Sequence, residues 1–399
     1  MSRNSRHIVL LQGPLGSFFK RLAREFMSHG DYVTRVCFNG GDEFYAAGDH
    51  IIKWNQRPEA WKAWLRDFVI ENSVDTIILY GDSRYYHKIA RRIGADLDVP
   101  VLCLEEGYLR PGYVTAEWGG NNANSPLMGE VVEPEGVAEP PAEIEPTFGY
   151  QAWSAIVYYH AKAFRLYRYR HYKHHRPGSP LGLLEIKGWV TAWPRKYRYQ
   201  RHDRKIAEEL IADYSNRYYL VPLQVAVDSQ VTEHSRFDNI PDFIEEVMSS
   251  FATYAEKSAM LVIKHHPMDR GFHHYGDFIQ QLAIKNEVED RVVYGFQFDL
   301  DILLEHARGC VTINSTVGIS AIEIGIPTVT LSNVLYNGIG LATHGNLDKF
   351  WPKPVTPDNS CFRQWRSSVI KLSLLAGSFY SGTEELAQKI RAKIELKTT

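Results

Sequence analysis

The chain has 399 residues, and its 45 Lys and Arg against 47 Asp and Glu give a formal net charge of −2. This length exceeds what one hydrophobic core usually supports, so it predicts two domains. Apolar residues make up 44% and charged residues 23% of the chain, an ordinary balance that excludes a mainly disordered protein.

The net charge conceals an uneven distribution. Residues 161–205 carry 13 Lys and Arg against two acids, a local charge of +11, while the other 354 residues carry −13. The segment also holds many Tyr and Trp residues, and basic residues with aromatics are typical of contact with an anionic membrane or lipid head group. A solvated helix face is the alternative. The candidate contacts are Arg165, Arg168 and Arg170.

Neither secretion nor membrane spanning is expected. The apolar run 8–11 is short and is broken by Gly13 and Pro14, and no stretch of about 18 apolar residues occurs. The cysteines are far apart and suggest buried thiols in a reducing cytoplasm, not a disulfide frame or a zinc site. They are Cys37, Cys103, Cys310 and Cys361.

The first 115 residues alternate strand and helix signals. Apolar strands that alternate with helices predict a parallel, doubly wound sheet. The expected strands are 8–12, 32–38, 76–80 and 99–104, and the expected helices are 18–28 and 84–93. Residues 130–146 are rich in Pro and Glu and predict an exposed loop, after which the basic aromatic segment has a largely helical pattern.

A second α/β series follows. Its expected strands are 218–224, 261–264, 291–294, 310–314 and 328–331, and its expected helices are 242–257, 300–306 and 317–325. A helical stretch over 362–394 ends the chain, with no strand after it. The prediction is an α/β fold of two Rossmann-like domains facing a cleft, with a basic helical insertion and a C-terminal helix. The expected segments are 1–150, 151–215, 216–355 and 356–399.

In open α/β sheets a ligand binds beyond the carboxyl ends of the strands, and four polar clusters fall there. The first cluster includes Gln12, Gly13 and Gly16, whose glycines permit close backbone approach to a ligand or simply serve a tight turn.

The second cluster is Glu105-Glu106-Gly107. Paired carboxyls at a strand end predict a general acid or base with a raised pKa, and exposed loop acids are the alternative. Arg110 follows as an internal partner or an anion ligand.

The third cluster contains Gln224, Asp228 and Ser229. A carboxylate here could attack an anomeric carbon, although a turn-forming Asp-Ser is the simpler interpretation.

The fourth cluster combines Lys264-His265-His266 with Asn314-Ser315-Thr316. A Lys and a His after one strand, together with a helix N-terminus after another, predict a phosphate site, although Ser-Thr also serves plain capping. Glu323, about two turns further, could hold a ribose hydroxyl or face solvent.

Other nucleotide and metal motifs are weak. No Walker A sequence and no full GxGxxG follows a strand. Asp-x-Asp occurs at Asp96/Asp98 and at Asp299/Asp301, but the first pair precedes a strand and the second opens a helix, where acids serve the cap. No metal site is predicted. A monophosphate-linked donor such as a CMP-sugar would suit a site built from His and helix N–H groups.

Several ordered motifs resemble the KpsS/LipB-type capsule polysaccharide proteins. The first-half motifs are LLQGPLGSFFKRLA, FNGGD, LYGDSRYYH and EEGYLRPGYVT. The second-half motifs are VPLQVAVDSQ, VIKHHPMDRG, NSTVGISAIEIGIP and GLATHGNLDKFW. The resemblance covers residues 8–125 and 218–351. It implies a GT-B-like β-Kdo transferase of Gram-negative bacteria, cytoplasmic and peripheral at the inner membrane. One copy of each motif favours the single-module type that starts the Kdo linker.

The resemblance also implies roles for residues. It places an acidic motif on Glu105, Glu106 and Gly107, a His-Pro motif on His266, and a phosphate-binding Ser/Thr motif on Ser315 and Thr316. Related retaining Kdo transferases imply a covalent carboxylate role for Asp228, which raises that residue above the turn interpretation.

The resulting hypothesis is a retaining transferase that moves Kdo from CMP-Kdo to a lysophosphatidylglycerol-type lipid, with no cofactor. The inner-membrane surface and other capsule assembly and export proteins are the expected partners, and no nucleic acid is expected. A transferase that uses another CMP- or UDP-sugar, or a non-catalytic adaptor of capsule export, is the alternative.

Overall fold

A computed structural model describes residues 5–129, 138–144, 148–173, 183–226, 231 and 234–398. The chain divides into two compact units. The first unit comprises Met1–Met128, Glu133–Gly182 and Ser367–Thr399, and the second comprises Gly129–Val132 and Leu183–Arg366.

The first unit contains a seven-stranded sheet with the order β13-β6-β5-β4-β1-β2-β3. Its strands are β1 (His7–Leu10), β2 (Tyr32–Cys37), β3 (His50–Lys53), β4 (Thr76–Tyr80), β5 (Val101–Glu106), β6 (Tyr113–Trp118) and β13 (Leu374–Ala376). The predicted parallel pairing is confirmed from β3 to β5. The strand β6, which was not predicted, pairs antiparallel with β5 because a tight loop containing Pro111 and Gly112 turns the chain back, so the sheet is not wholly parallel. The strand β3 was not predicted.

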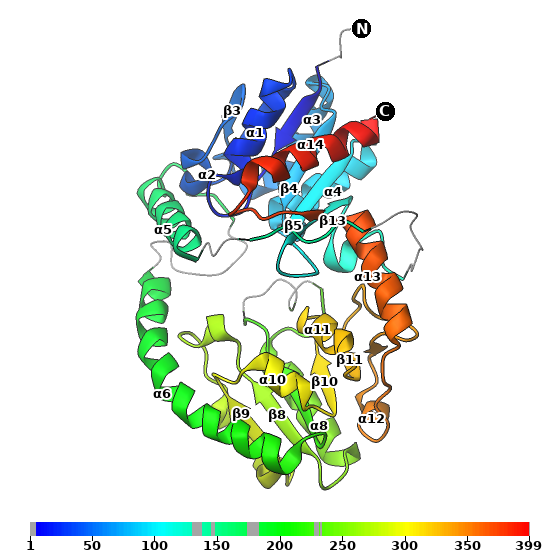
Figure 1. The fold of residues 1–399 in the computed structure, drawn as a ribbon. Coiled ribbons are helices and arrows are strands. Elements are labelled where there is room, and N and C mark those ends of the chain that lie inside the picture. Colours follow the sequence, from blue (N-terminus) through cyan, green and yellow to red (C-terminus); the bar gives the residue numbers. More distant parts are fainter. Residues whose placement is uncertain are drawn as a thin grey trace. The chain divides into compact units, whose positions relative to one another are not determined.

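Helices cover both faces of this sheet (Figure 1). They are α1 (Phe18–Ser28), α2 (Gly40–Phe44), α3 (Trp61–Glu71), α4 (Tyr85–Asp96), α5 (Phe148–Phe164) and α14 (Thr383–Thr398), with short 3₁₀ turns at Pro58–Ala60 and Asn122–Asn124. Side chains alternate along a strand, so Ile8 and Leu10 join the core under α1 and α14, while Val9 and Leu11 join the core under α3 and α4.

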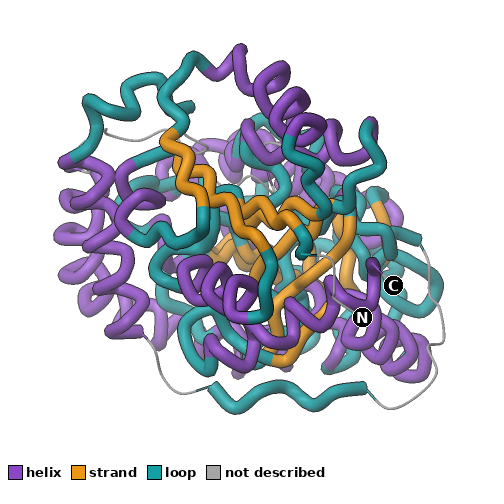
Figure 2. The backbone as a smooth tube through the Cα atoms, turned by 90° about the horizontal axis from the view of Figure 1, so that it is seen from above, coloured by secondary structure: helices purple, strands orange, loops and turns teal. Residues whose placement is uncertain are grey.

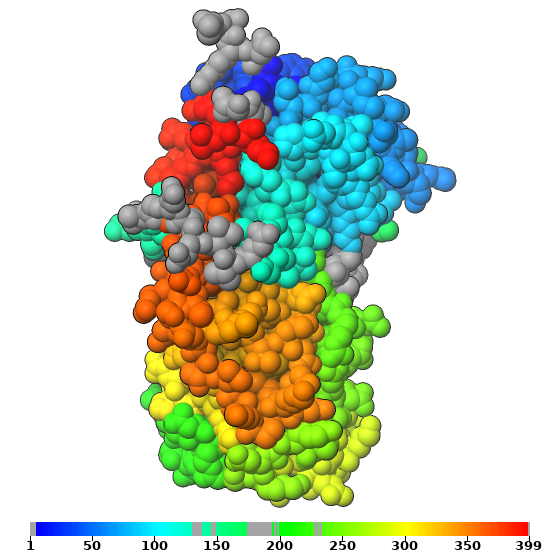
Figure 3. Space-filling model, turned by 90° about the vertical axis from the view of Figure 1, so that its right-hand side faces the viewer, coloured from blue at the N-terminus to red at the C-terminus, as the bar shows by residue number. Residues whose placement is uncertain are grey.

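The C-terminal segment returns to the first unit. The predicted continuous helical stretch over 362–394 is wrong, because α13 (Asn359–Ser373) ends at the short strand β13, which pairs antiparallel with β6. A three-residue apolar strand within a helical pattern gives no separate periodic signal. The helix α14 then packs along α1, and Figure 3 shows its red surface against the blue and cyan surface of this unit.

The second unit contains a six-stranded parallel sheet with the order β12-β11-β10-β7-β8-β9. Its strands are β7 (Tyr218–Pro222), β8 (Met260–Lys264), β9 (Val292–Gly295), β10 (Gly309–Thr312), β11 (Thr328–Thr330) and β12 (Thr343–His344). Its helices are α6 (Leu183–Tyr214), α8 (Ile240–Tyr254), α9 (Gly276–Lys285), α10 (Leu300–Glu305), α11 (Val317–Glu323) and α12 (Leu347–Phe350), with 3₁₀ turns at Pro267–Asp269 and Glu289–Arg291. Figure 2 shows strands in orange between helices in purple.

One buried carboxylate fastens the long helix α6 to this sheet. Asp203 is 1% exposed, and its Oδ2 accepts hydrogen bonds from the backbone N–H groups of Phe296 at 2.7 Å and Gln297 at 2.6 Å, just after β9. The ring of Tyr199, one turn earlier on α6, stacks on Phe296 with centroids 4.2 Å apart. The helix therefore depends on a polar contact that amphipathic spacing cannot predict.

We expect Asp203→Ala to lower the free energy of unfolding by about 2–4 kcal/mol, because it leaves two backbone donors without their charged acceptor. Denaturant unfolding measures this loss. Asp213→Ala, at an exposed position of the same helix, is the matched control and should change stability by less than about 0.5 kcal/mol. Equal stability of the two variants would contradict the fastening role.

Candidate functional site

Three neighbouring strands of the first unit bring their carboxyl ends together. The strands β1, β4 and β5 are adjacent, and they lead into Gly13, into the turn Gly81–Arg84 and into Glu105 and Glu106. The Nη1 of Arg84 donates to the carbonyl oxygen of Gly13 at 3.4 Å. The predicted glycine loop and carboxyl pair therefore lie at one edge of the sheet, together with an arginine that was not predicted.

Glu105 is the most perturbed acid of this edge. Protein atoms crowd its carboxyl although part of its surface stays open, and this burial raises its pKa to about 7. Arg84 and Arg110 lower that pKa, while the negative charges of Glu106 and Asp82 raise it. A carboxyl that titrates near neutral pH can accept or donate a proton, as a general acid or base must.

Glu106 lies beside it with a different partner. Burial raises its pKa, and Arg110 and a long hydrogen bond of 3.5 Å from the Tyr80 hydroxyl oppose the shift. Arg110 itself is exposed, and its Nε donates to the carbonyl oxygen of Gly107 at 2.9 Å. Gly107 leaves no room for a side chain, because a Cβ there would lie 2.3 Å from the carbonyl oxygen of Tyr113.

Gln12 does not face a ligand, contrary to the prediction. It is 3% exposed, and its Nε2 donates to Asp42 at 3.2 Å and to the Tyr158 hydroxyl at 3.0 Å. The Tyr172 hydroxyl donates to its Oε1 at 3.1 Å. Partners distant in the sequence thus satisfy its amide inside the protein.

The two glycines of FNGGD allow α5 to pack closely against the backbone of α2. A Cβ at Gly40 would lie 2.3 Å from the carbonyl oxygen of Ala161, and one at Gly41 would lie 2.6 Å from the Tyr158 ring. The Tyr158 hydroxyl also donates to Asp42 at 3.0 Å. Gly16, with φ of +105°, faces Ser154 in the same way. These glycines are explained by packing.

Two of the three arginines predicted at a membrane pair with Glu43, although the side chain of Arg168 stays 49% exposed. The Nη1 of Arg168 lies 2.5 Å from Oε1 of Glu43, and the Nε of Arg165 lies 3.7 Å from Oε2 of the same carboxylate. Lys53 and the Tyr169 hydroxyl also contact Glu43, at 2.9 Å each. Arg170 is also exposed, makes no ion pair with Glu43 and lies close to the Tyr167 ring.

The outer face of α5 and the turn after it carry large apolar side chains instead. Trp153 is 64% exposed, Phe164 88% and Tyr167 85%. The others on this face are Tyr150, Ile156 and Tyr159. Residues 148–173 contain no Asp or Glu and five Lys or Arg. We call the six apolar residues, with Arg170, the α5 outer face.

In the second unit, Lys264 ends β8 close to a second cation. It is 7% exposed, and burial and the charge of Arg270 lower its pKa, while Asp299 and Asp203 oppose the shift. Arg270, which was not predicted, is 8% exposed. Two largely buried cations at a strand end suit an anion.

The two adjacent histidines differ in position. His265 is fully buried, contacts Tyr294 through Nδ1 at 2.7 Å, and has a pKa lowered to about 4 by burial. It is neutral and packed in the interior, so it does not fit the predicted phosphate contact. His266 is partly exposed, and its Nδ1 accepts from the Met268 N–H at 3.2 Å. The proton of its neutral ring is then on Nε2, which can donate to an oxyanion.

Two other predicted clusters meet. The Nε2 of Gln224, after β7, donates to Oδ1 of Asn314, after β10, at 2.9 Å. The Oγ of Ser315 accepts from the Val317 N–H at 3.2 Å, whereas Thr316 makes no capping bond with its side chain. Glu323 is exposed at the other end of α11, 3.9 Å from Arg366, and does not join this group.

Asp228 and Ser229 lie outside the described residues. The chain that leads to them is held at Ala226, whose N–H donates to Oδ2 of Asp269 at 3.2 Å. Asp269 is 2% exposed and also contacts His273 at 2.8 Å. Ala226 is therefore fixed to the turn after β8.

No group of three His, Cys, Asp or Glu side chains among the described residues could hold a metal ion. Asp299 accepts from the N–H groups of Asp301 and Ile302, so this Asp-x-Asp caps α10. In the described part of the chain, no helix is both long and apolar enough to cross a bilayer.

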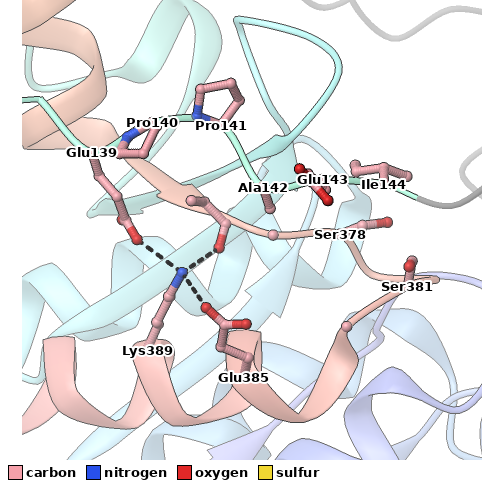
Figure 4. Close-up of a pocket in the computed structure, with 13 residues that line it drawn as sticks. Glu139, Pro140, Pro141, Ala142, Glu143, Ile144, Ser378, Ser381, Glu385 and Lys389 are labelled. Atoms are coloured by element: carbon pink, nitrogen blue, oxygen red, sulfur yellow. Dashed lines mark hydrogen bonds and ion pairs between the residues drawn. The ribbon is translucent and has the colours of Figure 1, made fainter.

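One cavity in the first unit has a volume of about 360 Å³ (Figure 4). Lys389 is its cation, and this ammonium already contacts Glu139 at 2.9 Å, Glu385 at 2.8 Å and the carbonyl oxygen of Ala376 at 2.9 Å. With its positive charge neutralised and one further carboxylate, Glu143, in the wall, this cavity does not suit an anion.

A sequence profile described as "Capsule polysaccharide biosynthesis protein" matches residues 75–380. The chain belongs to this family. It is 36% identical to the capsule polysaccharide export protein KpsS of Escherichia coli over 385 residues, covering 94% of this chain and 97% of KpsS. It is 34% identical to the capsule polysaccharide modification protein LipB of Neisseria meningitidis serogroup A over 391 residues, covering 95% and 92%.

A solved structure titled "Thermosulfurimonas dismutans KpsC, beta Kdo 2,7 transferase" aligns with 98% of this chain and 100% of that chain, at 14% identity and a TM-score of 0.45. A likeness at this level bears on no functional conclusion.

The raised pKa of Glu105 predicts a pH dependence of the free energy of unfolding that can be measured without any substrate. Its pKa rises from an ordinary 4.5 to about 7 on folding, so between these values the folded chain binds more protons than the unfolded chain, and stability falls as the pH rises. Glu105→Gln removes this loss. From pH 5 to pH 8, wild type should lose up to about 3 kcal/mol relative to the variant.

Denaturant unfolding across this pH range measures the difference. Glu71→Gln, an exposed acid of the same unit, is the control and should follow wild type. Parallel pH profiles for wild type and Glu105→Gln would show that the carboxyl titrates normally.

Proposed function

We propose that this chain is a retaining glycosyltransferase that moves Kdo from CMP-Kdo to a lysophosphatidylglycerol-type lipid and so starts the linker of a capsular polysaccharide. Membership in the capsule polysaccharide biosynthesis family supports the pathway. The observation that carries the enzymatic part is Glu105, a crowded carboxyl with a pKa near 7 at the end of a central strand. A non-catalytic adaptor has no use for such a group.

The proposed reaction has two displacements. The Asp228 carboxylate attacks C2 of Kdo, the bond from C2 to the phosphate oxygen breaks, and CMP leaves with the electron pair. Glu105 then takes the proton of the acceptor hydroxyl, whose oxygen attacks C2 and releases Asp228. Two inversions retain the configuration. Glu106 is the alternative base.

The second unit supplies the proposed donor site. Lys264 with Arg270, the Nε2–H of His266 and the polar end of α11 at Ser315 and Thr316 offer positive charge and hydrogen-bond donors to the departing phosphate. Fixed donors stabilise charge that develops in the transition state without a metal. No cofactor is therefore part of the proposal, and turnover should persist in a metal chelator.

The proposed acceptor lies in an anionic membrane surface, with the chain peripheral at the inner membrane. The α5 outer face supports this partner, because exposed Trp, Tyr and Phe beside basic residues and without acids suit the interface of an anionic bilayer. Arg170 and the half-exposed Arg168 are the proposed basic contacts, while Arg165 is less exposed and, like Arg168, lies near Glu43.

Asp228→Ala should abolish Kdo transfer, and Glu105→Gln should lower kcat by about 10²- to 10⁴-fold because the acceptor proton has no base. Turnover with CMP-Kdo and a lysophosphatidylglycerol analogue measures both effects. Asp238→Ala, an exposed acid of the second unit, is the control. Wild-type turnover by Asp228→Ala would exclude the covalent step, and equal turnover with CMP-sialic acid or a UDP-sugar would contradict the donor assignment.

The membrane partner has its own test. Replacing Trp153, Ile156 and Phe164 by Ser should weaken binding to vesicles of mixed phosphatidylglycerol and phosphatidylcholine by at least about tenfold, because these side chains lose apolar contact with the bilayer. Flotation measures the bound fraction. Ser replacements of Ile70 and Leu396, which are exposed on the same unit, are the control. Equal binding of both variants would contradict the assignment of the α5 outer face.

A further inference from the structure

Arg84 stands at the centre of the first-unit edge and forms no ion pair with an acid of the described residues. It precedes α4 and reaches over the Tyr80 ring, 5.3 Å from the ring centroid, to donate to the Gly13 carbonyl oxygen. No carboxylate among the described residues lies within 4 Å of its guanidinium. By contrast, Arg91, two turns along the same helix, pairs with Asp82 at 3.0 Å.

Arg84 and Glu105 approach each other across Gly81. Gly81 has a φ of +74°, and a Cβ at this position would lie 3.2 Å from Oε2 of Glu105 and 3.5 Å from Nε of Arg84. The two groups therefore lie on either side of the glycine, and no ion pair joins them. A side chain at position 81 would crowd the Glu105 carboxyl.

A buried histidine holds the turn that contains Gly81. His87 is 1% exposed, and its Nδ1 contacts the Gly81 carbonyl oxygen at 2.7 Å. Since a carbonyl only accepts, the ring donates from Nδ1. Burial lowers the pKa of His87 to about 3, so the ring adds no charge. The edge thus presents one guanidinium and one nearby carboxyl on either side of a glycine turn that is held in place.

We propose that Arg84 binds a phosphate ester group of the acceptor and thereby holds the acceptor's hydroxyl against Glu105. A guanidinium presents several N–H donors in a fork that matches phosphate oxygens. The Glu105 carboxyl, on the other side of Gly81, then receives the proton of a hydroxyl on the same acceptor molecule. This inference rests on the proposed function, because it takes the first unit as the acceptor side.

The test measures acceptor binding without any donor. The probes are short-chain lysophosphatidylglycerol below its micelle concentration, the matching monoacylglycerol without phosphate, and glycerophosphoglycerol without an acyl chain. Calorimetry of wild type, Arg84→Gln and Arg84→Lys gives each Kd. The control is Arg92→Gln, which removes an exposed arginine from the same helix.

Arg84→Gln should weaken binding of a phosphate-bearing probe by about 10- to 100-fold and leave the monoacylglycerol unchanged. Arg84→Lys, which keeps the charge and loses the fork, should fall between, and Arg92→Gln should match wild type. Dependence on Arg84 with the lyso-lipid alone identifies a lipid head group, and dependence with glycerophosphoglycerol as well identifies a site for the phosphate ester itself. Equal binding of all probes by wild type and Arg84→Gln would overturn the proposal.

Kinetics separate this inference from the proposed function. In the transfer reaction, Arg84→Gln should raise the KM for the phosphate-bearing acceptor more than it lowers kcat. Because Arg84 lowers the pKa of Glu105, its loss should also move the acid limb of the rate profile to higher pH. Wild type that binds the lyso-lipid through Arg84 but transfers no Kdo would contradict the donor assignment and support the role of Arg84.

Discussion

The candidate site depends on one constraint, the crowding of the Glu105 carboxyl at the end of a central strand, near a guanidinium with which it forms no ion pair. An ordinary ion pair would lower the pKa of that carboxyl and neutralise Arg84. Gly81 separates the two groups, and His87 holds the glycine turn. The result is a carboxyl at the end of β5 whose pKa burial raises to about 7, and a guanidinium at the start of α4 on the other side of Gly81.

Within the first unit, a series of hydrogen bonds links the candidate site to α5, the helix that carries the α5 outer face. Tyr158 of α5 donates to Asp42 and accepts from Gln12, and Gln12 directly precedes the Gly13 carbonyl that Arg84 contacts. The glycines at 40 and 41 permit this close packing. A helix that presents aromatic side chains to a membrane would thus be fixed to the loop that helps position the acceptor.

The sequence predicted the repeated βα pattern and the strand ends well, because apolar strands and helices differ in period. It predicted Glu105 from its place after such a strand. It could not predict Arg84, since an arginine at a helix start has no distinctive signal. The pairing of Arg165 and Arg168 with Glu43 joins residues more than 120 positions apart, and no local pattern indicates it. His265 and His266 look equivalent in sequence, but one is packed beside Tyr294 and the other caps a turn.

The second unit complements this picture with Lys264, Arg270 and the linked pair of Gln224 and Asn314 at neighbouring strand ends. In the proposed reaction, the chain joins Kdo to a glycerolipid. Mass spectrometry of the lipid recovered from purified protein, CMP-Kdo and synthetic lysophosphatidylglycerol tests it directly. The account predicts a product heavier than the acceptor by one added Kdo residue, and absent when Asp228 is replaced by Ala. Unmodified lipid with wild-type protein that binds both substrates would contradict it.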